Sequence, residues 1–483
     1  MTDSHHIVIN NFTHKETVTY PLILIRGHVN KFSNQCQSQQ HEEKIVIYYS
    51  DCEKYANLSG INFKFVLELK LGDNHIKLQY CCEILELKFE YTPCKSEYIV
   101  YPLYIICQGH NGSFQAPDEQ NNSKENACKR IHLIAKILQC VTAEKLHEKM
   151  LSRKTFALEN ECRIFYSELS VSKASKMDKH QLWEYLAREI MKSEIGNSKK
   201  KYLGFLSCTK YNGEKYDDSM TTYEDLLNIT ETYIALGGGG LALFGSGSLY
   251  TCPENVDKVI DNLIDQTAID KRKFLDDSCY RGTYGGCFST SLGSVLHELC
   301  HTFDLGHSEC GIMARGFDNI HKVFIPHSDD EDNIISKFQK TIEFKESLEP
   351  NLLSERLKNK PKEFKITGTS LKERNVDDTF WTKSCATILY YHKWFNNYPE
   401  KSHHVLKFDG SSKAFTSTAG LRVVEIRRLC DELVFVDWVF DGKILKYSFQ
   451  IPLEIEKLDN FPNFLIVAED NVGNIIKFDF SKF

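Results

Sequence analysis

Long apolar runs are missing from this sequence of 483 residues. The longest, such as the run from Tyr98 to Cys107, are about half as long as the roughly 20 apolar residues that a membrane-spanning helix needs. The opening residues MTDSHHIVINNF also lack the basic stretch followed by an apolar stretch that marks a secretory signal. We therefore expect a soluble, cytoplasmic protein with no signal peptide and no membrane partner.

An excess of basic charge is missing as well. Lysine and arginine number 59 against 66 aspartates and glutamates, which gives a net charge of -7 and a pI near 6.2. Proteins that bind nucleic acids usually carry a basic face. We therefore expect no nucleic-acid partner.

Paired cysteine motifs are also absent. The 17 cysteines are an odd number, they are scattered along the chain, and none belongs to a C-x-x-C pair. A disulfide framework normally has an even number of cysteines concentrated in a short secreted domain. We expect reduced thiols that are mostly buried, as in a cytosolic protein.

The patterns that are present divide the chain into three expected domains, at 1–97, 98–400 and 401–483. The first consists of short segments rich in β-branched and aromatic residues, with no helical stretch, which is typical of a β-sandwich. The strands expected there are His6–Ile9, Tyr20–Arg26, Lys44–Tyr49, Phe63–Leu69, His75–Tyr80 and Glu86–Tyr91.

The middle part mixes helices and strands, which predicts an α+β fold. Its expected strands are Ile99–Cys107, Cys162–Leu169, Tyr202–Cys208 and Leu241–Phe244. The first expected helix begins near Asn122 and is about 25 residues long. The other expected helices are Lys179–Lys192, Asn255–Asp265, and two later stretches at about 332–358 and 377–396.

The last part returns to alternating strands and predicts a second small β domain. Its expected strands are Leu421–Arg427, Glu432–Phe440, Leu445–Ile451, Phe464–Asp470 and Ile475–Phe480. No motif assigns chemistry to either β domain. A ligand of these domains is therefore left open.

The chemistry is concentrated in the segment LHELCHTFDLGH, which is residues 296–307. On a helix, His297 and His301 lie one turn apart on one face, so that both imidazoles can reach one metal ion. Glu298 is rotated by about 100° from His297 and lies beside the metal, where it can accept a proton from a bound water molecule. His307 is too far along the chain for the same helical face, and Gly306 is a residue that permits the necessary turn.

Three imidazoles with one open position are the ligand set of a catalytic zinc site. The alternative is a buried helix with hydrogen-bonded histidines. In a chain with this histidine content HExxH arises by chance roughly one time in twenty, and a third histidine at a fixed offset lowers this to on the order of one in several hundred. The spacing therefore favours a metal site formed by His297, His301 and His307.

This segment is similar to the metzincin signature HExxHxxGxxH, and Gly311-Ile312-Met313 resembles the Met-turn of that group. Four segments, GGGGLALFGSGSLY, DDSCYRGTYGG, HELCHTFDLGHSECGIMARGFD and FWTKSCATILYYHKWFN, together resemble a eukaryotic family of zinc metalloproteinases. The resemblance spans about 100 to 400. It implies a metzincin-like peptidase domain between the two β domains, with Met313 below the metal and Leu241–Phe244 as the edge strand that pairs with an extended peptide.

Asp304 stands where the metzincin signature has glycine. Aspartate tolerates a left-handed backbone better than most residues, so the turn remains possible. Asp304 is also an alternative ligand or a neighbour of the ligands, and Cys310 is a further residue that could approach the metal.

We expect a zinc-dependent metalloendopeptidase that hydrolyses peptide bonds of a peptide or protein substrate. Glu298 acts as general base on water bound to Zn2+. The alternative is a catalytically weak or inactive scaffold of the same fold with a structural zinc, and hydrolysis of a non-peptide amide is also compatible with the motif. An intact glutamate disfavours the scaffold, because a structural zinc has no need of it.

Overall fold

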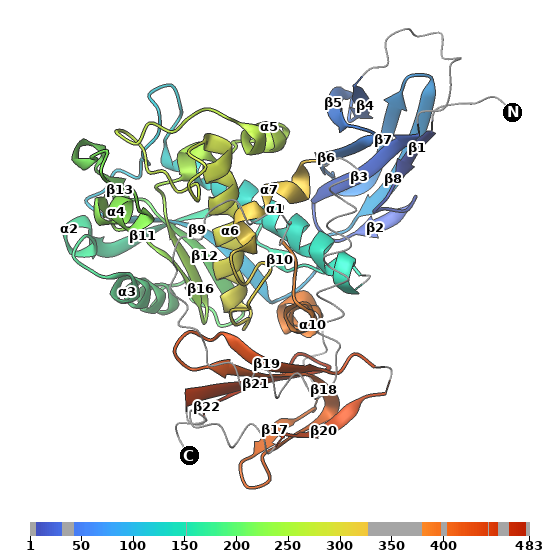
Figure 1. Cartoon of the computed structure of the whole chain (residues 1–483), viewed down its shortest axis with the longest axis vertical. Coiled ribbons are helices and arrows are strands. Elements are labelled where there is room, and N and C mark those ends of the chain that lie inside the picture. The colour runs from blue at the N-terminus through green and yellow to red at the C-terminus, as the bar shows by residue number, and fades with distance from the viewer. Residues whose placement is uncertain are drawn as a thin grey trace, which may run out of the picture.

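The structure is a computed structural model and describes residues 6–30, 43–150, 152–326, 379–397, 403–442, 444–452 and 463–479 (Figure 1). The helix expected at about 332–358 lies outside these residues. Within the described part of the chain, no helix is both long and apolar enough to cross a membrane. The described cysteines are free thiols, and Cys52, Cys82 and Cys430 are the exposed ones.

The first eight strands form one continuous sheet in the order β1-β3-β6-β5-β4-β7-β8-β2. Strand β5 joins its two halves, because the end of β5 pairs with β6 and the rest of it pairs with β4. β5 has no apolar alternation, since Ala56 is its only buried residue, and the sequence pattern therefore did not predict it. The strands are β1 His6–Ile9, β2 Glu16–Val18, β3 Leu22–Asn30, β4 Lys44–Tyr49, β5 Cys52–Ser59, β6 Asn62–Glu68, β7 Gly72–Tyr80 and β8 Glu83–Tyr91.

A second sheet forms the centre of the molecule, in the order β10-β9-β12-β16-β15, with β11 also paired with β9. All of its pairs are parallel except that of β15 with β16. The expectation that Leu241–Phe244 is the edge strand is wrong, because β16 is covered by β15 on one side and β12 on the other. The strands are β9 Ile99–Gln108, β10 Ala157–Leu158, β11 Arg163–Ser170, β12 Lys200–Leu206, β15 Ala235–Gly238 and β16 Leu241–Gly245.

Helices cover both faces of the central sheet. Helices α1 (Lys124–Met150) and α6 (Tyr284–Thr302) pack on one face, and α3 (Lys179–Lys192) packs on the other. Helix α3 has its predicted bounds because its apolar residues recur every fourth position and Asp178 caps its start. Smaller elements complete this part: α2 Val171–Ala174, β13 Lys210–Tyr211, α4 Tyr223–Asn228, β14 Thr230–Glu231, α5 Val259–Ile264 and α7 His321–Phe324.

The C-terminal strands form a third sheet around the long strand β18. Helix α10 (Lys383–Tyr391) lies between this sheet and the central part, in contact with α1 and β18 (Figure 1). It is shorter than the helix expected at 377–396, because the backbone leaves the helical region at His392 (ψ 139°). The strands are β17 Leu406–Asp409, β18 Ala414–Arg428, β19 Val434–Val439, β20 Lys446–Gln450, β21 Phe464–Asp470 and β22 Ile475–Asp479.

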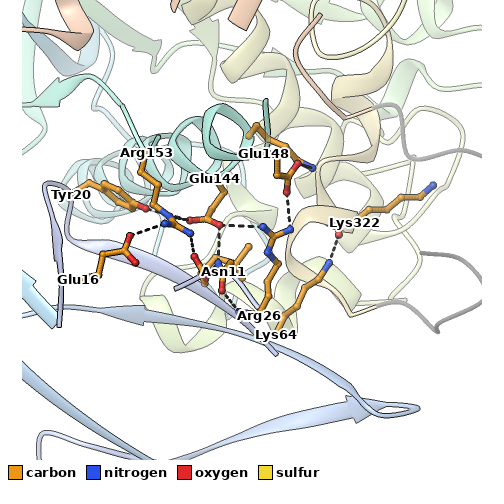
Figure 2. Close-up of polar contacts among 11 residues, drawn as sticks. Asn11, Glu16, Tyr20, Arg26, Lys64, Glu144, Glu148, Arg153 and Lys322 are labelled. Atoms are coloured by element: carbon orange, nitrogen blue, oxygen red, sulfur yellow. Dashed lines mark hydrogen bonds and ion pairs between the residues drawn. The ribbon is translucent and has the colours of Figure 1, made fainter. Parts of the chain in front are cut away.

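The N-terminal sheet is joined to α1 by buried ion pairs (Figure 2). The fully buried Glu144 carboxylate accepts from Arg153 at 2.7 Å and from Asn11 at 2.8 Å. Arg153 also pairs with Glu16 at 2.7 Å, and one hydrophobic cluster runs through both regions. The first 97 residues therefore share a core with the central part, and the expected domain boundaries remain a prediction.

Candidate metal centre

Helix α6 carries the first two histidines of the motif. Its start is capped by Thr283, whose hydroxyl oxygen accepts a backbone hydrogen bond at 3.1 Å. Two backbone segments, at Phe317 and in β15, lie in close contact with the helix. A β-carbon at Gly293 would lie 1.9 Å from the carbonyl oxygen of Phe317, and one at Gly237 in β15 would lie 1.8 Å from the carbonyl oxygen of Glu298. These close contacts fix α6 between the edge strand and the segment that follows the motif.

The chain turns after α6 at Asp304, which has a left-handed φ of 65°. Asp304 thus adopts the conformation that the glycine of the metzincin signature would provide. Gly306, which we expected to permit the turn, has no positive φ. Glycine is needed there for space, because a β-carbon would lie 2.5 Å from the carbonyl oxygen of Glu432 and 2.8 Å from the side chain of Arg427.

The three histidines of the motif come together. One ring nitrogen from each of His297, His301 and His307 lies within 4.8 Å of the other two. The Nε2 atoms of His297 and His301 are 3.2 Å apart. The ring centroid of His307 lies 5.3 Å from that of His297 and 4.6 Å from that of His301.

Backbone carbonyl groups orient the three rings. Because a carbonyl oxygen only accepts, each Nδ1 must carry the hydrogen, and each Nε2 keeps a free lone pair. A hydrogen bond from one ring nitrogen to a carbonyl group is typical of histidines whose other ring nitrogen binds a metal. The pairs are His297 Nδ1 with Ile312 O at 2.9 Å, His301 Nδ1 with Leu305 O at 2.9 Å, and His307 Nδ1 with Asp431 O at 2.5 Å.

These residues fit a zinc ion. Two ligands about 2.0–2.1 Å from a tetrahedral zinc are roughly 3.3 Å apart, which agrees with the 3.2 Å between the two Nε2 atoms. Burial, with the neighbouring histidines, lowers the pKa of His297 well below its ordinary value and that of His301 to about 4. Both rings are therefore neutral at neutral pH, as a metal ligand must be.

Glu298 is held against the edge strand. Its Oε2 atom accepts the backbone N–H of Gly237 at 2.7 Å, and no described residue bonds Oε1. Burial raises the pKa of Glu298 to about 7, although the bond from Gly237 acts in the opposite direction. A cation bound by the histidines would lower this pKa by attraction. The carboxylate thus has one oxygen anchored on β15 and one oxygen that no described residue bonds.

Asp304 and Cys310 do not belong to the group of close ligand atoms, which among the described residues contains the three histidines alone. The Asp304 carboxylate instead pairs with Lys477 Nζ at 3.0 Å and with His392 Nε2 at 3.4 Å. Met313 is buried, and its position below a metal ion stays a prediction.

A cavity of about 30 Å³ opens next to the start of β15. Its wall includes Tyr233 and Ala235, Asp277, and Ser291 and Ser294 of α6. Ser294 lies four residues before Glu298, which is about 6 Å along a helix. The cavity is therefore one helical turn from the glutamate.

Sequence reasoning did not identify the backbone groups that position the site. The N–H of Gly237 and the carbonyl groups of Ile312, Leu305 and Asp431 have no signal of their own in a sequence. It also did not single out Arg315, whose positive charge contributes to the lowered pKa of His297.

Residues 6–388 match the model of a family described as "Putative peptidase family". The match covers well over half of the chain, so the chain belongs to this family of peptidases.

Two curated yeast proteins, both described as "Putative zinc metalloproteinase", are similar to it. One, from Saccharomyces cerevisiae, is 25% identical over 356 residues, which are 67% of this chain and 50% of that protein. The other, from Schizosaccharomyces pombe, is 22% identical over 346 residues, which are 66% of this chain and 53% of that protein. The chain thus spans about half the length of these relatives. The membership in a zinc metalloproteinase family that the motifs predicted is confirmed.

Proposed function

We propose that this protein is a zinc-dependent peptidase in which His297, His301 and His307 hold one zinc ion through Nε2. The observation that carries the proposal is the arrangement of the three rings: each Nδ1 is bonded to a carbonyl oxygen, and one ring nitrogen of each histidine lies within 4.8 Å of the other two. Among the described residues no fourth ligand lies with the three histidines, so a zinc ion held by them could also take a water molecule, as in a catalytic rather than a structural site.

A metzincin-like fold of this domain is part of the proposal. It is supported by a mostly parallel sheet with one antiparallel edge strand, by the helix that carries the first two histidines beneath that edge strand, and by the left-handed turn at Asp304 before the third. The backbone of Ile312, next to Met313, contacts His297.

When bound, the zinc lowers the pKa of a water molecule and polarises the carbonyl group of the substrate. Glu298 removes a proton from this water with Oε1, while Oε2 stays on the N–H of Gly237. The oxygen of the water bonds to the carbonyl carbon, and Glu298 then gives the proton to the amide nitrogen as the carbon–nitrogen bond breaks.

The substrate we propose is a peptide or protein chain that pairs with β15. Among the described strands, β15 pairs with β16 alone, so its other side can add an extended strand. Pairing along a strand engages several backbone groups within a chain, which favours an endopeptidase.

Elemental analysis of the wild type and of His297→Ala, His307→Ala and Glu298→Ala proteins tests the proposal. We expect one zinc per wild-type chain, loss of zinc in both histidine variants, and retention of zinc with loss of peptide hydrolysis in Glu298→Ala. Absence of zinc from reconstituted wild-type protein would refute the proposal. Full hydrolysis by Glu298→Ala would refute the role of the glutamate. Bound zinc without hydrolysis of any peptide in a library would instead support a scaffold.

A further inference from the structure

His307 differs from the other two histidines in what holds it. The carbonyl groups that orient His297 and His301 belong to Ile312 and Leu305, which are near them in sequence. The carbonyl that orients His307 belongs to Asp431, 124 residues away in the turn between β18 and β19.

The main chain of His307 is bound by the same turn. Its N–H donates to the carbonyl oxygen of Glu432 at 3.1 Å, and its carbonyl oxygen accepts from Val434 N–H at 2.9 Å. His307 and Leu433 thus form a parallel β-bridge. Ring and backbone of the third histidine are both fixed by the C-terminal sheet.

A buried arginine extends this contact to the turn after α6. The fully buried side chain of Arg427 donates to the carbonyl oxygen of Asp304 at 2.7 Å. It also pairs with the buried Glu425 at 2.6 Å and with Glu432 at 3.2 Å. The charge of Arg427 is therefore compensated, and its remaining donor holds the residue whose left-handed backbone directs the chain to His307.

We propose that the turn between β18 and β19, residues 429–433, is an obligatory part of the metal centre, and that the C-terminal sheet sets the zinc affinity of the chain by positioning His307. The inference rests on the proposed zinc site. His297 and His301 are fixed by a rigid helix, whereas His307 lies in a loop. Without this turn, zinc binding itself would have to order the loop. The conformational entropy lost in ordering the loop would then weaken the binding of zinc.

Gly306 offers a sharp test, because a β-carbon there would lie 2.5 Å from the carbonyl oxygen of Glu432. Gly306→Ala should therefore push the turn away from His307. Gly442→Ala, in the loop between β19 and β20, is the matched control, since its β-carbon would lie no closer than 3.8 Å to any atom outside its immediate neighbours. Arg427→Lys is a second variant, which keeps the charge and loses the bidentate geometry.

Zinc affinity is measured by competition with a chromogenic chelator on the full chain. Loss of an outer contact to a metal-bound histidine typically weakens binding about 10–100-fold. We expect this loss in Gly306→Ala and Arg427→Lys, and wild-type affinity in Gly442→Ala. In the wild type, zinc should also slow hydrogen exchange at Val434 N–H, which the bridge holds, because the coupling is reciprocal.

Failure of this inference is distinguishable from failure of the zinc site. If the wild type binds zinc and His297→Ala abolishes binding, while folded Gly306→Ala and Arg427→Lys bind as tightly as Gly442→Ala, the inference is refuted and the zinc site stands. If both variants fail to fold, unchanged exchange at Val434 on addition of zinc refutes it. A wild type that binds no zinc refutes both.

Discussion

Gly237 and Gly238 are neighbours in β15, yet a methyl group should have opposite consequences at the two positions. At Gly237 the added β-carbon would lie 1.8 Å from the carbonyl oxygen of Glu298, whereas ordinary contact begins at 3.4 Å. Strand and helix would have to separate by about the difference of 1.6 Å between these distances. At Gly238 nothing lies within 4 Å.

This separation would break the bond of 2.7 Å between Gly237 N–H and Glu298. Misplacement of a catalytic group by about 1 Å can cost about 100-fold in rate, and we expect that loss in kcat/KM for Gly237→Ala. Overpacking should also lower the free energy of unfolding by about 1–3 kcal/mol. Zinc content should not change, because no histidine contacts β15 through a side-chain bond. The free energy of unfolding of Gly238→Ala should stay within about 0.5 kcal/mol of that of the wild type, like an ordinary surface substitution, because the added β-carbon meets no other atom within 4 Å.

The assays are cleavage of a fluorogenic peptide selected with the wild type, denaturant unfolding, and elemental analysis of zinc. Unfolding provides a readout that does not depend on a substrate. Equal kcat/KM and equal stability of the Gly237→Ala and Gly238→Ala proteins would show that β15 does not press on α6 as described. Loss of zinc from Gly237→Ala would show that the strand acts on the histidines and not on Glu298.

Three further predictions concern stability. Asp304→Gly keeps the left-handed turn and should be more stable than Asp304→Ala by about 1 kcal/mol; equal denaturant midpoints would contradict this. Arg153→Met removes the nearer of the two cations that pair with the buried Glu144, at 2.7 Å against 3.5 Å for Arg26, and should cost about 3–5 kcal/mol of stability. Arg26→Met, at a side chain that is 27% exposed, should cost less; equal losses would contradict this. Burial alone would raise the pKa of Glu148, but the charges of Lys145 and Arg26, which both pair with its carboxylate, lower it to about 2. These ion pairs therefore stabilise the fold above pH 4.5 and are lost as the pH falls towards 2, so the stability difference between wild type and Glu148→Gln should shrink over that range; a constant difference would argue against the ion pairs.

Local patterns were sufficient for many elements. Helix α3 and strands β1, β4 and β21 have the bounds that the sequence predicted. The apolar residues of α3 recur every fourth position, and the strands are short runs rich in β-branched or aromatic residues. The spacing of His297 and His301 on α6 likewise predicted that these two rings would meet, since a helix fixes the relative positions of residues four apart. The fixed offset of His307 in the motif predicted the third ring, which lies with them in the structure. The tolerance of Asp304 for a left-handed turn could also be argued from its side chain alone.

Contacts between distant backbones could not be predicted in this way. Strand β15 contains two glycines among its four residues, so it has no side-chain alternation, and only its pairing with β16 reveals the true edge of the sheet. The carbonyl of Asp431 reaches His307 from 124 residues away, and any residue type would supply the same carbonyl. The sequence by itself determined which side chains are candidates to bind a metal and to act as a base, because that is a matter of chemical type and local spacing. The tertiary structure decided what holds them, because backbone groups are alike in every residue and acquire a role only through the fold.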